Sequence, residues 1–271
     1  MNVATALAQG VELLERDHIE APRLTAEVLL AHALACERVY LWAHPERELT
    51  DVEQLHYGRY LHERLRRKPT QYITGRQEFY GREFRVTPAV LIPRPETELV
   101  VETALEHASG ARRVLDVGTG SGCLAVTLQM ERPQAEVFAG DLSAAALAVA
   151  RENARRLGAA VRFFCGDLLE ACAARSFDLV VSNPPYIPLD QARGLPAEVR
   201  EYEPGVALFG DLYEKLLGGA ARVLRPGGWL IVELPYDGRE RVQAQAGEEW
   251  APGIVVPDLA GFDRVLAWRL R

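Results

Sequence analysis

Apolar residues recur at helical spacing along the N-terminal part of the chain. One apolar face runs from Val3 to Leu14, a second covers residues 26–34, and a third helix is expected from Asp51 to Arg67. Thr50 or Asp51 is placed to cap this third helix, because a short polar side chain there can accept one of the free N–H groups. We therefore predict a helical domain over residues 1–75.

The pattern changes after this helical part. Residues Glu78–Val86 alternate around Gly81 in the manner of a short hairpin, and a proline-rich stretch, Ile92–Pro95, follows. We predict a hairpin linker over residues 76–92 and a second domain over residues 93–271, which begins with a helix near Glu96–Ala108.

From residue 112 onward, short apolar runs alternate with helical segments. Such alternation predicts an α/β domain, in which a mostly parallel, doubly wound sheet carries helices on both faces. The expected helices are Gly122–Glu131, Ala144–Leu157 and Leu212–Leu224. The seven expected strands are Arg113–Val117, Glu136–Gly140, Val161–Cys165, Phe177–Ser182, Trp229–Leu234, Gly253–Val256 and Arg264–Trp268.

Composition narrows the class of protein. The 271 residues are 48% hydrophobic and 25% charged, with a formal net charge of −7, which makes general affinity for nucleic acid phosphates unfavourable. No signal peptide or membrane-length apolar stretch is recognisable, and the four cysteines form no CxxC pair, so we expect a reduced, cytoplasmic protein. All six histidines precede residue 110 and no HExxH pattern occurs, so no metal site is expected.

A glycine-rich turn follows the first strand of the α/β part. The segment reads Asp116, Gly118, Thr119, Gly120, Ser121 and Gly122, a pattern that lets the backbone approach a ligand closely. A dinucleotide fingerprint starting at Gly118 would need glycine at Cys123, whereas one starting at Gly120 leaves Asp116 without a role. Asp116 would repel a pyrophosphate but attract an ammonium group. A purely structural strand–helix corner is the alternative.

Two further strand ends carry acidic residues. Asp141 lies about 20 residues after the glycines, where a carboxylate can accept hydrogen bonds from both ribose hydroxyls. Its alternative role is to cap the next helix, although Ser143 could do so instead. Asp167 can accept a hydrogen bond from an adenine amino group while Leu168 packs on the ring, or Asp167 can simply be a solvated turn residue.

The segment Asn183-Pro184-Pro185-Tyr186 follows a buried strand and can hold a planar NH2 group. The Asn183 side-chain oxygen and the Pro184 backbone carbonyl can each accept one hydrogen, and the Tyr186 ring can cover the group. Two such acceptors turn the nitrogen lone pair toward an electrophile. With the ammonium, ribose and adenine subsites, the clamp points to S-adenosylmethionine as the cofactor, because its activated methyl needs chiefly positioning. Alone, the segment could be a strand terminator.

Over almost its whole length the chain resembles the class I methyltransferases of the HemK/PrmC family. The matching segments are 69–75, 91–98, 116–122, 183–187, 203–204 and 258–264. The resemblance implies methylation of the side-chain amide of the glutamine in the Gly-Gly-Gln motif of release factors 1 and 2. It implies that residues 118–122, Asp141, Leu168 and Asn183 hold the cofactor, that residues 183–186 hold the glutamine, and that the helical domain contacts the release factor.

Two departures from the family pattern affect loops. The stretch 206–212 looks shortened, and Pro235 stands where glycine is usual. Two other functions stay open: an adenine-N6 methyltransferase acting on DNA or RNA, which would need a basic groove, and a noncatalytic assembly protein that keeps the cofactor as a structural ligand.

Overall fold

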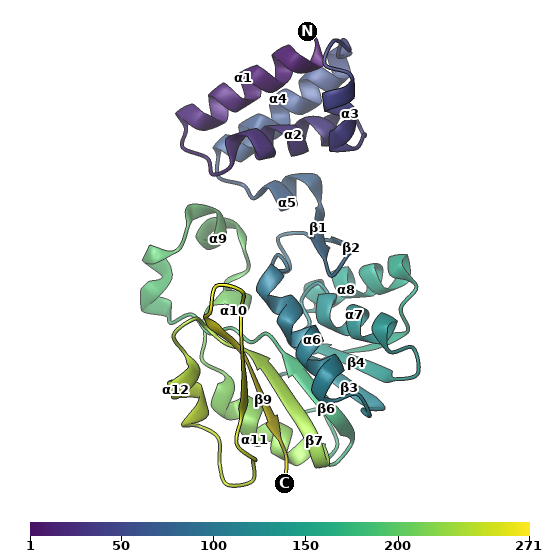
Figure 1. Ribbon diagram of the computed structural model, residues 1–271, viewed down its shortest axis with the longest axis vertical. Coiled ribbons are helices and arrows are strands. Elements are labelled where there is room, and N and C mark those ends of the chain that lie inside the picture. Colours follow the sequence, from purple (N-terminus) through teal and green to yellow (C-terminus); the bar gives the residue numbers. More distant parts are fainter. The chain divides into compact units, whose positions relative to one another are not determined.

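The computed structural model describes all 271 residues and divides into two compact units (Figure 1). Unit 1 comprises Met1–Arg76 together with Pro196–Tyr202, and unit 2 comprises Gln77–Leu195 and Glu203–Arg271. No helix is both long and apolar enough to cross a membrane.

Unit 1 is helical, as its apolar spacing predicted. Its helices are α1 (Val3–Arg16), α2 (Pro22–Ala33), α3 (Arg38–Ala43), α4 (Asp51–Leu65), α5 (Thr70–Thr74) and α9 (Ala197–Tyr202). Thr50 caps α4 through a capping box, in which its hydroxyl accepts from the Glu53 N–H and the Glu53 carboxylate accepts from the Thr50 N–H. Short helices α3 and α5 were not predicted, because fewer than two turns show no clear period.

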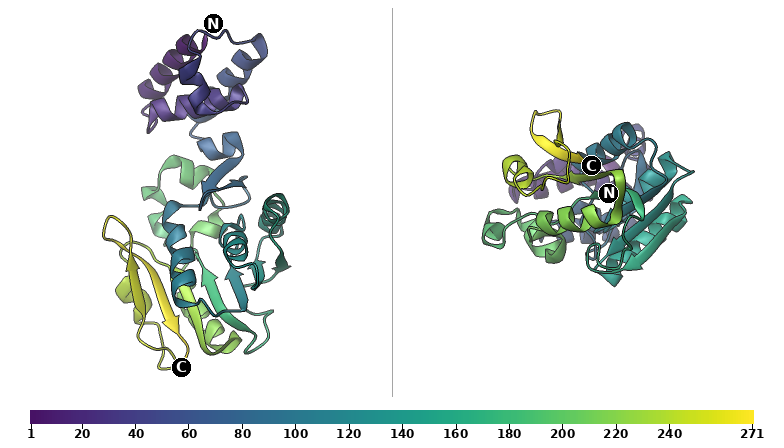
Figure 2. Two further views of the ribbon diagram at one scale, coloured as in Figure 1. Left: turned by 45° about the vertical axis from the view of Figure 1, so that its right-hand side comes forward. Right: turned by 90° about the horizontal axis from the view of Figure 1, so that it is seen from below.

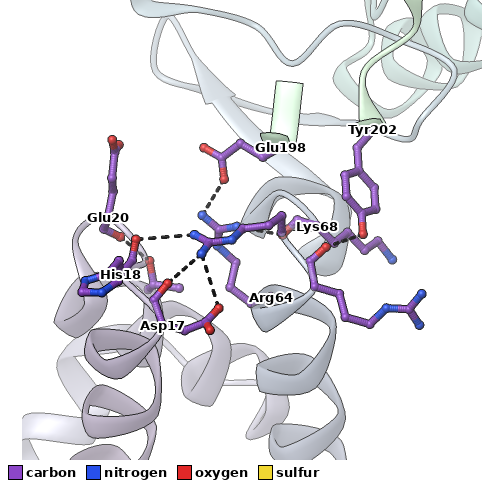
Figure 3. A network of polar contacts seen from close by, with 10 residues as sticks. Asp17, His18, Glu20, Arg64, Lys68, Glu198 and Tyr202 are labelled. Carbon is purple, nitrogen blue, oxygen red and sulfur yellow. Dashed lines mark hydrogen bonds and ion pairs between the residues drawn. The ribbon is translucent and has the colours of Figure 1, made fainter. Parts of the chain in front are cut away.

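A segment from late in the chain, α9, contributes to unit 1 (Figure 3). Glu198 forms an ion pair with Arg64, whose side chain is only 7% exposed, and the Tyr202 hydroxyl donates to the Arg66 carbonyl at 2.6 Å. Arg67 donates to the backbone carbonyls of Asp17 and His18. The basic end of α4 is therefore largely occupied by contacts within unit 1.

The core of unit 2 is a seven-stranded sheet in the order β5-β4-β3-β6-β7-β9-β8. Pairing is parallel from β5 to β7, and β9 runs antiparallel to both of its neighbours, as Figure 2 shows for the green and yellow strands. The strands are β3 (Arg113–Val117), β4 (Glu136–Asp141), β5 (Val161–Cys165), β6 (Phe177–Ser182), β7 (Leu224–Glu233), β8 (Ile254–Pro257) and β9 (Asp263–Arg269). This confirms the predicted fold class.

Neighbouring residues of the central strands enter two separate cores. Val114 belongs to the core under α6, α7 and α8, whereas its neighbour Leu115 faces the core under α11 and α12. The helices of this unit are α6 (Glu98–His107), α7 (Cys123–Glu131), α8 (Ala144–Leu157), α10 (Gly205–Leu208), α11 (Tyr213–Val223) and α12 (Arg239–Gln243), with 3-10 turns η1 (Pro95–Thr97) and η2 (Leu189–Gly194). The sheet is thus covered on both faces, which leaves the loops at its carboxyl edge to form a site.

The predicted hairpin is formed by β1 (Arg76–Phe79) and β2 (Arg82–Arg85). Phe79 and Phe84 are fully buried in the core of unit 2, so the hairpin packs as part of that unit. The buried Asn153 of α8 hydrogen-bonds the backbone of Arg85 in both directions, and its Nδ2 also donates to the Ser121 carbonyl at 2.9 Å. The hairpin therefore braces the glycine-rich turn.

Candidate functional site

A cavity opens at the carboxyl ends of β3, β4, β5 and β6, and we call it the site cavity. Ten residues singled out from the sequence line it: Gly118, Thr119, Gly120, Ser121, Asp141, Asp167, Leu168, Asn183, Pro184 and Pro185. Asp116, Gly122 and Tyr186 do not. Side chains that lie far apart in the sequence meet here because parallel strands end on the same edge of the sheet.

The glycines shape the wall of the cavity through their backbone conformation. Gly118, Gly120 and Gly122 all have positive φ, between +54° and +82°, which side chains rarely adopt. At Gly122, which caps α7, an added Cβ would also lie 3.1 Å from the Ala150 Cβ. The turn therefore needs glycine for conformation at all three positions and for close helix packing at the third.

Asp116 lies beneath this turn rather than on the cavity wall. It is 1% exposed, and its Oδ2 accepts from the Thr119 hydroxyl at 2.6 Å and from the Ala125 N–H at 3.2 Å. Its Oδ1 is buried without a partner, and burial raises the pKa of Asp116 to about 7. The carboxylate points into the strand–helix corner and does not line the cavity, and its contact with a ligand ammonium group stays a prediction.

Asp141 faces the site cavity from the end of β4. Its Oδ2 accepts from the Gly120 N–H and its Oδ1 from the Ser143 N–H, both at 2.8 Å. Ser143 is the N-cap of α8 and accepts from the Ala146 N–H. Asp141 therefore does not serve as that cap, and each carboxylate oxygen keeps a lone pair for a further donor.

The residues that follow β5, Asp167 and Leu168, combine an exposed carboxylate with a strained backbone. Leu168 has a φ of +45°, unusual for a leucine, and lines the cavity beside the exposed Asp167. Backbone strain of this kind persists where the surroundings hold it, often at binding sites. Cys123 also reaches the cavity, but burial raises the pKa of its thiol to about 12, in keeping with a packing role.

Asn183 is held from behind by a hydrogen-bonded network. Its Nδ2 donates to the Thr97 hydroxyl at 3.2 Å, and that hydroxyl donates to Glu233 Oε2 at 2.6 Å. The Tyr186 hydroxyl faces the other carboxylate oxygen of Glu233 at 3.4 Å, and its ring packs against the core. Tyr186 is thus directed away from the cavity, and burial raises its pKa.

The sequence did not assign roles to four residues that the structure places at or behind the cavity. Glu203 is buried and accepts from the Ile92 N–H and from the Arg94 guanidinium, which ties the two proline-containing segments together. Thr97 and Glu233 form the network behind Asn183. Motifs at 91–98 and 203–204 were visible, but nothing local shows which of their side chains meet.

The charged residues of the cavity wall favour a cationic ligand over an anionic one. The charged lining residues are Asp141, Asp167 and Arg94, and Arg94 is neutralised by Glu203. Behind the turn, Asp116 adds a buried carboxyl group whose Oδ1 has no hydrogen-bond partner. A ligand with sulfonium and ammonium charges suits such a wall, whereas a pyrophosphate would find no free cation.

Solved structures show the fold of unit 2. A methyltransferase from Pyrococcus furiosus superposes with a TM-score of 0.53 at 20% identity, over 70% of this chain and 90% of that one. A 16S rRNA N2 G1207 methyltransferase from T. thermophilus, in complex with AdoMet and guanosine, gives a TM-score of 0.54 at 22% identity, over 72% of this chain and 50% of that one. At such identity the likeness concerns the fold alone.

Sequence comparisons extend to the whole chain. Residues 5–75 match the PrmC N-terminal domain and residues 95–194 match the methyltransferase small domain. The chain is 45% identical to a release factor glutamine methyltransferase from Koribacter versatilis and 44% identical to one from Moorella thermoacetica, in each case over 99% of both proteins. The protein therefore belongs to the family of release factor glutamine methyltransferases, as the motifs in its sequence predicted.

Proposed function

We propose that this protein transfers the methyl group of S-adenosylmethionine to the side-chain amide nitrogen of the glutamine in the Gly-Gly-Gln motif of peptide chain release factors. The observation that carries the proposal is the position of Asn183: its amide lines the same cavity as the glycine turn and Asp141. The names of the full-length relatives supply the substrate class.

In this proposal the glycine turn and the strand ends hold the cofactor, whose sulfonium supplies an already activated methyl group. The backbone at residues 118–122 receives its amino-acid end, and Asp141 accepts from the ribose hydroxyls with the lone pairs left by its two backbone bonds. Leu168 packs on the adenine ring and Asp167 accepts from its amino group. Asp116 acts at one remove, by holding the turn through its hydrogen bonds from Thr119 and Ala125.

The substrate amide is positioned by acceptors. Asn183 Oδ1 and the Pro184 carbonyl each accept a hydrogen bond from one of its two N–H groups, which turns the nitrogen lone pair toward the methyl group. Pro185 lines the cavity alongside and shields the amide from water. Tyr186 supports this segment through the core instead of stacking on the substrate.

The two parts of the chain divide the work. We assign substrate recognition to the helical domain over residues 1–75, with release factors 1 and 2 as its partners. We assign catalysis to residues 93–271, and we assign to the predicted linker, residues 76–92, the role of bracing that part, because its hairpin phenylalanines are buried in the same core.

The test is methyl transfer under single-turnover conditions with saturating cofactor. Purified release factor 1, release factor 2 and duplex DNA are offered separately, and Asn183→Ala is compared with the wild type. We expect transfer to both release factors and none to DNA, and a fall of roughly 100-fold or more in Asn183→Ala because the amide can rotate out of line. Asn183→Asp keeps an acceptor but cannot donate to Thr97, so we expect an intermediate rate.

The variants must keep the far-UV circular dichroism of the wild type. Transfer to DNA but not to release factors would overturn the proposed substrate. A folded Asn183→Ala protein that transfers methyl at the wild-type rate would return Asn183-Pro184-Pro185-Tyr186 to the role of a strand terminator.

A further inference from the structure

The network behind Asn183 is buried and has a defined direction. Thr97 is 2% exposed and Glu233 is 3% exposed, and they come from η1 and from the end of β7. The two residues lie 136 positions apart in the sequence, yet their side chains hydrogen-bond at 2.6 Å. A buried threonine–glutamate pair beside a cavity is costly unless its hydrogen bonds are satisfied.

The direction follows from the donors that each group has. An ionised carboxylate only accepts, so Thr97 must give its single hydroxyl proton to Glu233. The Thr97 oxygen is then left with lone pairs alone and can only accept, and it accepts from Asn183 Nδ2. If the Asn183 amide turned over, its Oδ1 would face the Thr97 oxygen with no proton between them. The carboxylate therefore decides which end of the amide faces Thr97.

We propose that Glu233, acting through Thr97, is a positioning residue that keeps the Asn183 side-chain oxygen, rather than its nitrogen, presented to the substrate amide. This inference rests on the proposed function, because it needs Asn183 Oδ1 to accept a hydrogen from the glutamine. If the Asn183 amide were turned over, its NH2 group would face the NH2 group of the substrate glutamine, and the two donors could not form a hydrogen bond. The glutamine nitrogen would then lose its alignment with the methyl group. Neither Thr97 nor Glu233 touches the substrate in this scheme.

Protonation of Glu233 removes the constraint on direction. Burial raises its pKa to about 7, opposed by the hydrogen bond from Thr97. The titratable and charged groups around it are Glu96, Cys123, Tyr186, Tyr213 and Arg264. A protonated Glu233 can donate to Thr97, which frees the Thr97 proton for either neighbour. The ordered arrangement therefore belongs to the pH range above about 7.

Four variants separate this role from simple packing. Thr97→Val removes the hydroxyl but keeps the shape, and Thr97→Ser restores it. Glu233→Gln keeps the shape but offers either an acceptor or a donor. Thr103→Val is the matched control. Thr103 lies in α6, the helix that follows η1, and it is as buried as Thr97. Its hydroxyl donates a hydrogen bond to the Leu99 carbonyl of the same helix.

Single-turnover methylation of a release factor is measured with saturating cofactor, together with cofactor affinity by calorimetry. We expect Thr97→Val and Glu233→Gln to slow transfer roughly 10- to 100-fold at unchanged cofactor affinity. Thr97→Ser and Thr103→Val should stay close to the wild-type rate. In an Asn183→Ala background, neither Thr97→Val nor Glu233→Gln should slow transfer further, because the group that they orient is gone.

The pH dependence gives a second, independent measurement. The ratio of the wild-type rate to the Glu233→Gln rate should be largest above pH 7 and should shrink toward one as the pH falls, because protonated Glu233 resembles glutamine. Taking the ratio cancels other groups that titrate in this range, including Asp116.

Several outcomes would overturn the inference. These are a wild-type rate in Thr97→Val, a Thr97→Ser protein as slow as Thr97→Val, additive losses in the Asn183→Ala background, or a pH-independent ratio. If Thr97→Val fails to fold by circular dichroism, Glu233→Gln and Thr97→Ser decide the question. A wild-type rate in Asn183→Ala would instead refute the proposed clamp itself, so the two failures are distinguishable.

Discussion

Replacement of Asp141 by alanine tests the cofactor side of the cavity. The carboxylate makes two backbone hydrogen bonds of 2.8 Å, to Gly120 and Ser143, and in our proposal it also accepts from the ribose hydroxyls. Hydrogen bonds to a charged group contribute about 1.5–3 kcal/mol. Loss of the ribose contacts should therefore weaken cofactor binding roughly 10- to 100-fold.

The same substitution has a smaller effect on folding. The Gly120 and Ser143 N–H groups lie beside the cavity, where water can replace the carboxylate, so we expect a loss of about 1 kcal/mol and a melting temperature lower by a few degrees. Asp141→Asn keeps one acceptor oxygen and should fall between the wild type and Asp141→Ala in both measurements.

Calorimetry with S-adenosylhomocysteine and its 2′-deoxyribose analogue separates the two effects. The wild type should bind the deoxy analogue more weakly than the parent compound, whereas Asp141→Ala should distinguish the two less. A folded Asp141→Ala protein with wild-type affinity for the parent compound would remove Asp141 from the ribose site.

Three further outcomes are expected. Burial raises the pKa of Asp116 from 3.8 to about 7, so the stability that it contributes is present at acid pH and is lost as the pH rises toward about 7. The melting temperature of Asp116→Asn minus that of the wild type should therefore increase from pH 5 to pH 8, and a difference that does not change with pH would contradict this. A fragment beginning at Gln77 should bind cofactor but methylate intact release factor poorly, and undiminished turnover by this fragment would exclude the helical domain from substrate recognition. A fragment beginning at Pro88 lacks the buried hairpin phenylalanines and should melt at a lower temperature than the first. Gly10→Ala places a Cβ 1.9 Å from the buried Tyr57 hydroxyl, so it should lower the free energy of unfolding in denaturant by about 1–3 kcal/mol. Gly58→Ala, on the open face of α4, should raise the free energy of unfolding by about 0.5–1 kcal/mol, and equal effects of the two substitutions would refute this account of the packing.

The central strands could be predicted from sequence because each is a short apolar run between turn residues. The bounds of β3, β5 and β6 agree with the expectation, as does α8. Strand β7 was expected from Trp229 but begins at Leu224, which pairs with Phe177 before a register shift. The local sequence there, Arg-Pro-Gly-Gly, is typical of a turn, so only the partner strand reveals the earlier pairing.

The short helices α9, α10 and α12 and the turn η2 were not predicted. With four to six residues each they show no apolar period, and α9 is held instead by the Arg64 side chain of α4 and by the backbone carbonyl of Arg66, which follows that helix. Long-range partners of this kind leave no local signal in a single sequence.

Residues at strand ends were predictable as site candidates, but the directions of their side chains were not. Asp116 and Asp141 both sit at carboxyl ends of strands, yet one points into the corner beneath the turn and the other onto the cavity wall. The contacts of Thr97 with Glu233 and of Arg94 with Glu203 join segments more than 100 residues apart. Only the assembled sheet brings these groups within reach.

The position of β9 has a consequence for synthesis of the protein on the ribosome. It follows every other strand of the sheet in the chain, yet it lies inside the sheet, between β7 and β8. A nascent chain that already contains every candidate site residue still exposes the unpaired edge of β7, and β8 emerges before its only partner. Exposed edges are where growing chains mispair with one another. The emerging polypeptide is therefore most vulnerable to aggregation in the interval before residues 263–269 become available.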